Sequence, residues 1–199
     1  MGNLFRKAEQ CIQQISSNDV FVEIGSARGT GGSTHYFAEL AKQVGTVLHS
    51  VDLDDRQYIF RDIPNVIGYQ DSGSNWAKHV FPTLGKTIAC LYLDNYDYNY
   101  WGDIDNNIIK NQKIEYLEKY NMVMSNQDCV VEHLKQMMAL LPFMGKNSVV
   151  ICDDTYLQND CWIGKCGAVV PYLVANGFSI TEVECLQGSS YGVLLTNVS

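Results

Sequence analysis

Long apolar runs are missing from this sequence, and so is any block of positive charge. No stretch reaches the roughly 18 apolar residues that a membrane-spanning helix needs, so we expect no membrane span and no membrane partner. Lysines and arginines number 14 against 22 aspartates and glutamates, which gives a net charge of −8. An acidic chain repels phosphate backbones unless it carries a local basic patch, so we expect no nucleic-acid partner.

A cysteine framework is also lacking. The seven cysteines are an odd number, and no two of them form a C-x-x-C pair. Structural zinc sites and disulfide-rich secreted domains use regularly spaced cysteines, so the scatter indicates reduced thiols. The opening residues are polar and helix-like instead of forming an apolar leader. Together these features predict a cytoplasmic protein.

The sequence does contain short apolar runs that alternate with helical patterns over 199 residues. This length suits a single domain, 1–199, and the alternation is typical of a parallel sheet with helices on both faces. The last two runs leave no room for a helix between them, so we expect an antiparallel hairpin there. The expected fold is therefore an α/β, Rossmann-like, doubly wound seven-stranded sheet, mostly parallel. The expected strands are Val20–Ile24, Thr46–Val51, Val66–Tyr69, Ile88–Leu93, Ser148–Cys152, Phe178–Cys185 and Ser190–Thr196, and the expected helices are Ser33–Val44, Trp76–Leu84, Gln127–Leu141 and one between Ile163 and Asn176.

One irregular insert, 95–126, follows the fourth expected strand, and its part 108–120 is helix-like. Connections in such folds usually have about 2–6 residues, so we expect this insert to be a lid, a substrate wall or an oligomer contact. A homo-oligomer is one of these expectations. Near the start of the insert lies an aromatic cluster: Tyr96, Tyr98, Tyr100 and Trp101. These rings either contact the acceptor or pack the insert onto the sheet.

A glycine turn follows the first strand, with Gly25 and Gly29 spaced as G-x-x-x-G. Glycines here let backbone N–H groups approach a ligand at the start of the next helix. Asp52 ends the second strand, where a carboxylate accepts hydrogen bonds from ribose hydroxyls in doubly wound folds. The two features together favour an adenosine-type cofactor.

The spacing distinguishes between such cofactors. A dinucleotide pyrophosphate is usually admitted by G-x-G-x-x-G, which is not the pattern here. The anionic Glu23, at the end of the first strand, suits the sulfonium and ammonium groups of S-adenosylmethionine better than a pyrophosphate. We therefore expect S-adenosylmethionine, with an NAD-type oxidoreductase and a non-catalytic cofactor-binding Rossmann-like protein as the alternatives.

Three carboxylates follow two neighbouring strands. Asp94 comes after the fourth strand, and Asp153 and Asp154 come after the fifth. Parallel strands end at one edge of the sheet, so these side chains should meet, and an oxygen-rich site suits Mg²⁺, Ca²⁺ or Mn²⁺. Without a cation the three would repel one another. The alternative is that they cap helices or pair with lysine and arginine.

The run Glu23-x-Gly25-x-x-x-Gly29 followed by Asp52 resembles motif I and the acidic strand end of class I S-adenosylmethionine-dependent methyltransferases. The resemblance covers nearly the whole chain from Asp19 onward. It implies that Asp52 holds the ribose, and that residues at the methionine end and near the adenine contact the rest of the cofactor. These further cofactor residues are Gly25, Ser26, Gly29 and Ser33 at the glycine turn, and Asp71 and Ser72 after the third strand.

Asp94, Asp153 and Asp154 fall where catechol O-methyltransferase and the macrocin-type sugar O-methyltransferases hold their metal. That resemblance implies a metal that binds two neighbouring oxygens of a small hydroxylated acceptor and acidifies one hydroxyl. A sugar or sugar nucleotide is the first expectation, and a catechol-like phenol is the second. Catechol-type enzymes carry a lysine three residues after the first metal aspartate, where this chain has Asp97. The general base thus stays open among Asp94, Asp97, His133 and Lys165.

Overall fold

A computed structural model describes residues 3–12, 15–29, 31–100, 107–186 and 190–197 of the chain. Its main sheet has seven strands in the order β3-β2-β1-β4-β5-β9-β8. All neighbours pair in parallel except β9, which is antiparallel to both β5 and β8. The mostly parallel sheet with a C-terminal antiparallel hairpin is therefore confirmed. The strands are β1 Asp19–Ile24, β2 Leu48–Asp52, β3 Val66–Gln70, β4 Thr87–Leu93, β5 Met144–Asp153, β8 Phe178–Leu186 and β9 Ser190–Asn197.

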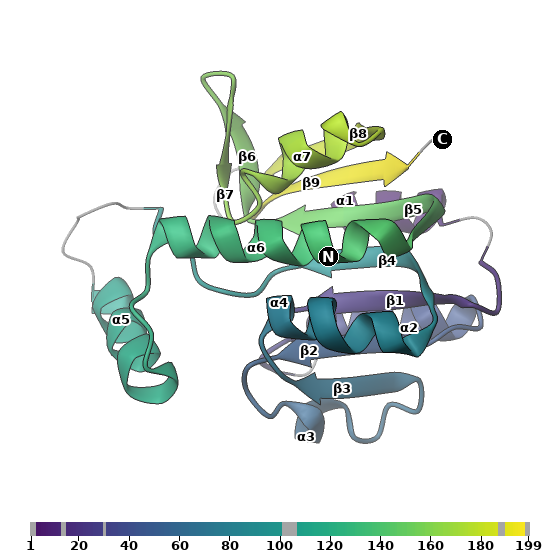
Figure 1. Cartoon of the computed structure of the whole chain (residues 1–199), viewed down its shortest axis with the longest axis horizontal. Helices are drawn as coiled ribbons and strands as arrows, with labels where there is room; N and C mark the ends of the chain where they lie inside the picture. The colour runs from purple at the N-terminus through teal and green to yellow at the C-terminus, as the bar shows by residue number, and fades with distance from the viewer. Residues whose placement is uncertain (1–2, 13–14, 30, 101–106, 187–189, 198–199) are drawn as a thin grey trace.

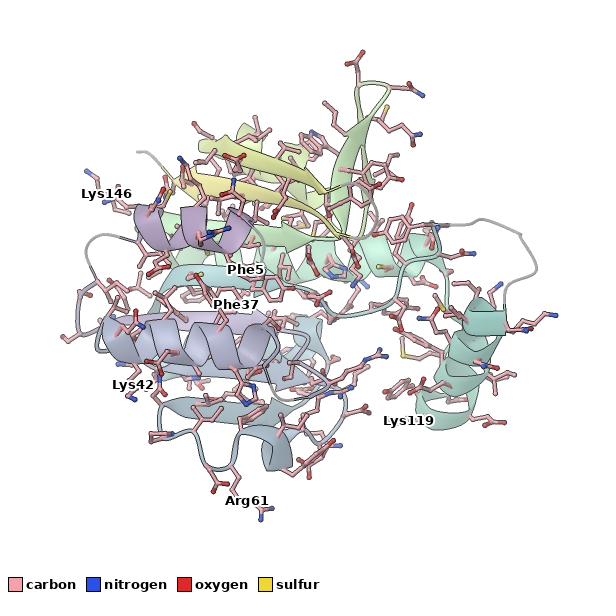
Figure 2. All side chains as sticks on the ribbon, turned by 180° about the vertical axis from the view of Figure 1, so that it is seen from behind. Phe5, Phe37, Lys42, Arg61, Lys119 and Lys146 are labelled. Atoms are coloured by element: carbon pink, nitrogen blue, oxygen red, sulfur yellow. The ribbon has the colours of Figure 1, made fainter. Side chains whose placement is uncertain are left out.

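Helices cover both faces of the sheet. Helices α4, α6 and α7 lie on the face turned to the viewer in Figure 1, and α1 and α2 lie on the opposite face, seen in Figure 2. Helix α5 stands away from the sheet (Figure 1). Among the helices that the structure describes, none is long and apolar enough to cross a membrane. The helices are α1 Asn3–Cys11, α2 Ser33–Gln43, α3 Gln57–Phe60, α4 Gly73–Asn75, α5 Asn107–Tyr120, α6 Asn126–Leu140 and α7 Val169–Ala175.

The core forms on both faces because side chains alternate along each buried strand. On β1, Val22 and Ile24 pack toward α6 and α7, whereas Phe21 packs toward α2. Figure 2 shows Phe5 of α1 and Phe37 of α2 in the space between these two helices, and their ring centroids are 5.3 Å apart. Both faces of the central strands are thus sealed, and polar side chains concentrate at the strand ends.

Two segments differ from the sequence expectation. The region 76–84 is helical, but it consists of a π-helical turn, Trp76–Val80, followed by a 3₁₀ turn, Phe81–Leu84, which contains a proline. A second, two-stranded sheet was not predicted and projects as a hairpin in Figure 1: β6 Thr155–Gln158 and β7 Cys161–Gly164. Its Asn159-Asp160 turn has positive φ at both residues, which is the backbone that two-residue hairpins favour. In the sequence, the Asn159-Asp160 dipeptide was the one signal for this hairpin.

The first turn of α1 is capped by a side chain from the far end of the sequence. The Glu184 carboxylate on β8 accepts hydrogen bonds from the backbone N–H groups of Asn3 and Leu4, at 2.8 and 3.1 Å. An acidic group at a helix N-terminus satisfies unpaired N–H groups and interacts favourably with the helix dipole. Glu184 therefore fixes α1 against the sheet.

The Glu184→Ala variant should lower the free energy of unfolding by about 1 kcal/mol, because it removes a helix cap. Hydrogen exchange should accelerate first in the amides of α1. The comparison is Glu182→Ala, which removes a carboxylate from the same strand but not the cap. Equal exchange of α1 in the two variants would contradict this role for Glu184.

Candidate functional site

A cleft of about 340 Å³ opens at the carboxyl ends of β1, β2 and β4. We call it the main cleft. Four of the predicted cofactor residues line it: Gly25, Ser26, Asp52 and Asp71. Ligands of doubly wound folds bind at this edge of the sheet, which is the edge where the sequence analysis expects the cofactor.

Gly25 is required by the close approach of two strands. Its φ is +98°, and a Cβ atom at this position would lie 2.5 Å from the backbone of Asp94 and Asn95. Any other residue would push β1 away from the end of β4. The glycine therefore keeps the turn and the first of the three aspartates in contact.

Asp52 is held in place from three sides. Its carboxylate accepts hydrogen bonds from the backbone N–H groups of Ser26 at 3.0 Å and Asp54 at 2.9 Å. The Nε atom of Arg56 lies 3.1 Å from its Oδ2 atom. The carboxylate is thus oriented into the main cleft and paired with a cation, which a ribose hydroxyl would have to share or displace.

Glu23 turns away from the main cleft. Its carboxylate is fully buried on the α2 side of the sheet, where it accepts hydrogen bonds from three hydroxyls. These belong to Ser33 at 2.6 Å and to Thr34 and Ser50 at 2.7 Å. Burial raises the pKa of Glu23 to about 7, although the hydroxyls oppose this shift. Glu23 joins β1 to α2 and β2, so it supports the glycine turn from below.

Three other predicted cofactor residues are also not among the described residues that line the main cleft. The hydroxyl of Ser33 is bonded to Glu23. Ser72 caps α4 by accepting a hydrogen bond from the backbone N–H of Asn75 at 3.3 Å. Gly29 lies in open space, where a Cβ atom would meet nothing within 4 Å. Strand alternation and local capping, which a motif does not encode, set these positions.

The three predicted metal residues do come together. One carboxylate oxygen from each of Asp94, Asp153 and Asp154 lies within 4.8 Å of the others. The ammonium of Lys165 lies among them, 2.5 Å from Asp94 Oδ1 and 3.0 Å from Asp154 Oδ2. The Tyr92 hydroxyl lies 2.9 Å from Asp153 Oδ2 and 3.2 Å from Asp94 Oδ2. The three carboxylates therefore surround one positive charge, and that charge is the ammonium of Lys165.

The β6–β7 hairpin fixes Lys165 at this place. The chain leaves the site at Asp154 and returns at Gly164, whose φ is +106° and where a Cβ atom would overlap the Asp154 carbonyl. The Lys165 N–H then donates to that carbonyl at 3.3 Å. Burial would lower the pKa of Lys165, but Asp94 and Asp154 more than offset it and raise the pKa well above the ordinary value. Burial, Asp94 and Asp154 raise the pKa of Asp153.

The four candidate bases lie in different surroundings. Asp94, Asp97 and Lys165 line the main cleft. His133 is fully buried on α6, and its Nδ1–H donates to the Cys129 carbonyl at 2.8 Å. Burial lowers the pKa of His133 to about 4, so the ring is neutral. His133 is thus a buried helix-face histidine, bonded one turn back along its own helix.

The described part of the insert forms a wall of the main cleft through Glu115, Tyr116 and Tyr120 of α5. The ammonium of Lys119, labelled in Figure 2, lies 2.7 Å from the Asp54 carboxylate, and the Tyr120 hydroxyl donates to it at 2.8 Å. Burial would raise the pKa of Asp54, but these two hydrogen bonds and the positive charges nearby lower it. One carboxylate therefore anchors α5 to the connection after β2.

The aromatic residues at the start of the insert mostly pack it in place. The rings of Tyr96 and Tyr116 have centroids 4.9 Å apart, which joins the start of the insert to α5 in its second half. Tyr98 contacts Tyr100 at 4.7 Å, and the Tyr100 hydroxyl donates to the Asp154 carbonyl at 2.5 Å. Only Tyr96 contributes to the main cleft among the described aromatic residues of this cluster. Trp101 lies outside the described residues.

Comparison with known proteins adds to this geometry. No family model matches the sequence, and no curated protein matches it. Among solved structures, a proposed rRNA methylase from Clostridium thermocellum matches at 11% identity with a TM-score of 0.56, over 98% of this chain and 97% of that one. The chain has a methyltransferase fold. At this identity the match establishes the fold alone.

Two other structures with this methyltransferase fold contain ligands. A LepI variant, solved with SAH and a substrate analogue, matches at 11% identity and a TM-score of 0.55, over all of this chain and 49% of that one. The MycE methyltransferase of mycinamycin biosynthesis was solved with Mg, SAH and mycinamycin VI. It matches at 8% identity with a TM-score of 0.53, over 92% of this chain and 45% of that one. The chain spans about half the length of each.

Several cleft residues carried no sequence signal. Arg28 lies inside the glycine turn, where the motif leaves its type free, and its guanidinium is 3.6 Å from the Asp97 carboxylate. Arg56 contacts Asp52 from the start of a short helix that no periodicity marked. Tyr116 and Tyr120 are spaced i, i+4 on α5, which indicates a shared face but not what it covers.

The Glu23→Gln variant should remove one pH dependence of stability. The folded pKa of about 7 exceeds the ordinary 4.5, so the protonated form stabilises the fold. This contribution is fully present below pH 4.5 and is lost as the pH rises through 7. Between pH 4.5 and 8 the wild type should lose about 3 kcal/mol relative to the variant, measured by urea unfolding. Glu39→Gln, on the exposed side of α2, should follow the wild type; a Glu23→Gln curve that also did so would contradict the assignment.

Proposed function

We propose that this protein is an S-adenosylmethionine-dependent O-methyltransferase acting on a small hydroxylated acceptor, with a divalent cation at the three aspartates. The observation that carries the proposal is the continuity of the main cleft. It runs from Asp52 and Asp71, which suit an adenosine, to Asp94, Asp153 and Asp154. A donor bound along this cleft would end at a group of carboxylates able to hold the acceptor.

The residues present fit the cofactor. Gly25 lines the main cleft without a side chain to obstruct it, and Asp52 offers carboxylate oxygens for ribose hydroxyls. Asp94 and Asp97 place negative charge at the other end of the cleft, where a sulfonium would be stabilised. When bound, S-adenosylmethionine supplies an electrophilic methyl group on a cationic sulfur. LepI and MycE, which share the fold, were solved with SAH.

The donor set also fits a hard divalent cation. Carboxylate oxygens are the ligands that Mg²⁺, Mn²⁺ and Ca²⁺ prefer. When all three are ionised, Asp94, Asp153 and Asp154 carry three negative charges against one positive charge on Lys165, and the remaining two would match a divalent ion. A metal here would hold two acceptor oxygens and acidify a hydroxyl. MycE, with the same fold, was solved with Mg.

Charge and position select the base. Lys165 keeps its proton because its pKa is raised, so it orients Asp94 and Asp154 and accepts nothing. His133 is buried away from the cleft lining, and Asp94 is committed to the cation. Asp97 remains, with its backbone N–H donating to the Tyr116 hydroxyl at 2.8 Å and its carboxylate facing the cleft. We therefore assign to Asp97 the role of the base that takes the proton from the acceptor hydroxyl.

The acceptor is a small molecule: a sugar or sugar nucleotide first, a catechol-like phenol second. The net charge of −8 and the acidic cleft oppose a nucleic acid, and the likeness to an rRNA methylase is one of fold. The free, mostly buried cysteines support a cytoplasmic location. The apolar residues Ile114 and Leu117, half exposed on α5, would suit a contact in a homo-oligomer.

Calorimetric titration of SAH tests the cofactor assignment. The wild type should bind SAH, and Asp52→Asn should weaken binding about 10- to 100-fold through the loss of charge-assisted hydrogen bonds. Asp62→Asn, an exposed aspartate on the connection to β3, is the matched control and should bind normally. Absence of SAH binding by the folded protein, or binding of NAD in its place, would overturn the assignment.

A Mn²⁺ titration followed by electron paramagnetic resonance tests the metal. Asp153→Asn and Asp154→Asn should abolish binding, whereas Lys165→Met should tighten it about tenfold by removing a competing positive charge. Asp160→Asn, at the exposed tip of the same hairpin, should behave as wild type. Free Mn²⁺ in the presence of both wild type and Lys165→Met would exclude the metal and leave Lys165 as the cation of the site.

A further inference from the structure

A second hollow, of about 380 Å³, adjoins two of the three aspartates, Asp94 and Asp153. We call it the α1 hollow, because Leu4 and Phe5 of α1 form one wall of it. Asp94 and Asp153, together with Ala27 and Arg28, line both the α1 hollow and the main cleft. Two ligands, one in each space, would therefore meet at Asp94 and Asp153. Asp97 adjoins this junction from the main cleft, because its carboxylate lies 3.6 Å from the guanidinium of Arg28, which lines both spaces.

The far wall of the α1 hollow comes from the C-terminal hairpin. Tyr191 lines it, and its ring is held by Tyr156 of β6, with centroids 4.8 Å apart. The next residue is Gly192, where a Cβ atom would lie 2.7 Å from Leu4 Cδ2. The glycine leaves room beneath α1, and the tyrosine provides a fixed aromatic surface beside that room.

The polar lining is dominated by carboxylates. Glu184 adds a third acidic group to Asp94 and Asp153, and Arg28 is the sole guanidinium among the described residues of this lining. Arg28 also lies 3.6 Å from Asp97, so part of its charge is already compensated. The lining alone has three carboxylates against one guanidinium. With Asp154 and Asp97 beside it, five carboxylates face at most four positive charges, those of a divalent cation, Lys165 and Arg28. Such a lining repels phosphates and carboxylates and favours groups that donate hydrogen bonds.

We propose that the α1 hollow is the acceptor pocket, and that it takes an uncharged or amine-bearing polyhydroxylated ring, such as an amino sugar, in preference to a phosphorylated or nucleotide-linked one. Hydroxyl and ammonium groups donate to the carboxylates, and the C–H face of the ring packs on Tyr191. The volume suits one ring and its substituents. The assignment rests on the proposed methyl transfer and narrows its acceptor.

The test is methyl transfer from labelled S-adenosylmethionine, with Mg²⁺, to three separate acceptor pools, read by mass spectrometry. The pools are neutral and amino sugars, sugar nucleotides, and catechols. We expect label in the first pool. If calorimetry still shows SAH binding but the label appears only in another pool, or in none, the acceptor assignment is overturned and the cofactor assignment stands. Loss of SAH binding itself overturns the proposed function.

Two variants locate the pocket. Tyr191→Ala should raise the KM for the labelled acceptor at least tenfold, while SAH affinity stays within twofold. Gly192→Val should do the same by filling the hollow, and it gives a second reading if Tyr191→Ala does not fold. Tyr58→Ala is the matched control, because that ring is 66% exposed on α3. An unchanged KM in both folded variants overturns the pocket assignment.

Discussion

A buried ammonium among three carboxylates holds the carboxyl edge of this sheet together. Asp94, Asp153 and Asp154 end two neighbouring parallel strands, and their mutual repulsion would push those ends apart. Lys165 opposes that repulsion from contact distance, and it reaches the site only because a two-stranded hairpin brings the chain back to Asp154. The main cleft and the α1 hollow are both lined by Asp94 and Asp153. The site therefore depends on one charge balance.

The buried carboxyl group of Glu23 supports the side of the same edge that faces the main cleft. Glu23 collects hydroxyls from α2 and β2, and this ties the glycine turn to the strand that carries Asp52. Gly25 then lets the turn touch the end of β4. The two sets of carboxyl groups thus have different positions: Glu23 builds the turn from the interior, and the partly exposed aspartates after β4 and β5 line the main cleft.

The sequence predicted those features that follow from a repeating pattern. Apolar runs and glycine turns located the strands, and the edge rule for parallel strands brought Asp94 and Asp153 together. The sequence analysis left pairing of the aspartates with a lysine as an alternative, which the structure shows, but it did not identify Lys165 as that lysine, because the contact depends on a hairpin whose residues resemble a loop. Nor did it assign Glu23 to the interior, since a motif does not state which way a strand side chain points. The α1 hollow joins segments about 180 residues apart, as the Leu4–Glu184 contact illustrates, which no local pattern reveals.

The β6–β7 hairpin is packed at its base and exposed at its tip. Within the part of the chain that the structure describes, its strands pair only with each other, and Asn159-Asp160 lies at the solvent-exposed turn. Insertions at that turn would alter neither the seven-stranded sheet nor the position of Lys165, whereas any change of length between Gly164 and Lys165 would move the ammonium. The rim of the site can therefore be lengthened or reshaped at the hairpin tip during evolution while the ammonium of Lys165 keeps its position. Proteins on this scaffold can diverge in what they recognise without rebuilding how they hold charge.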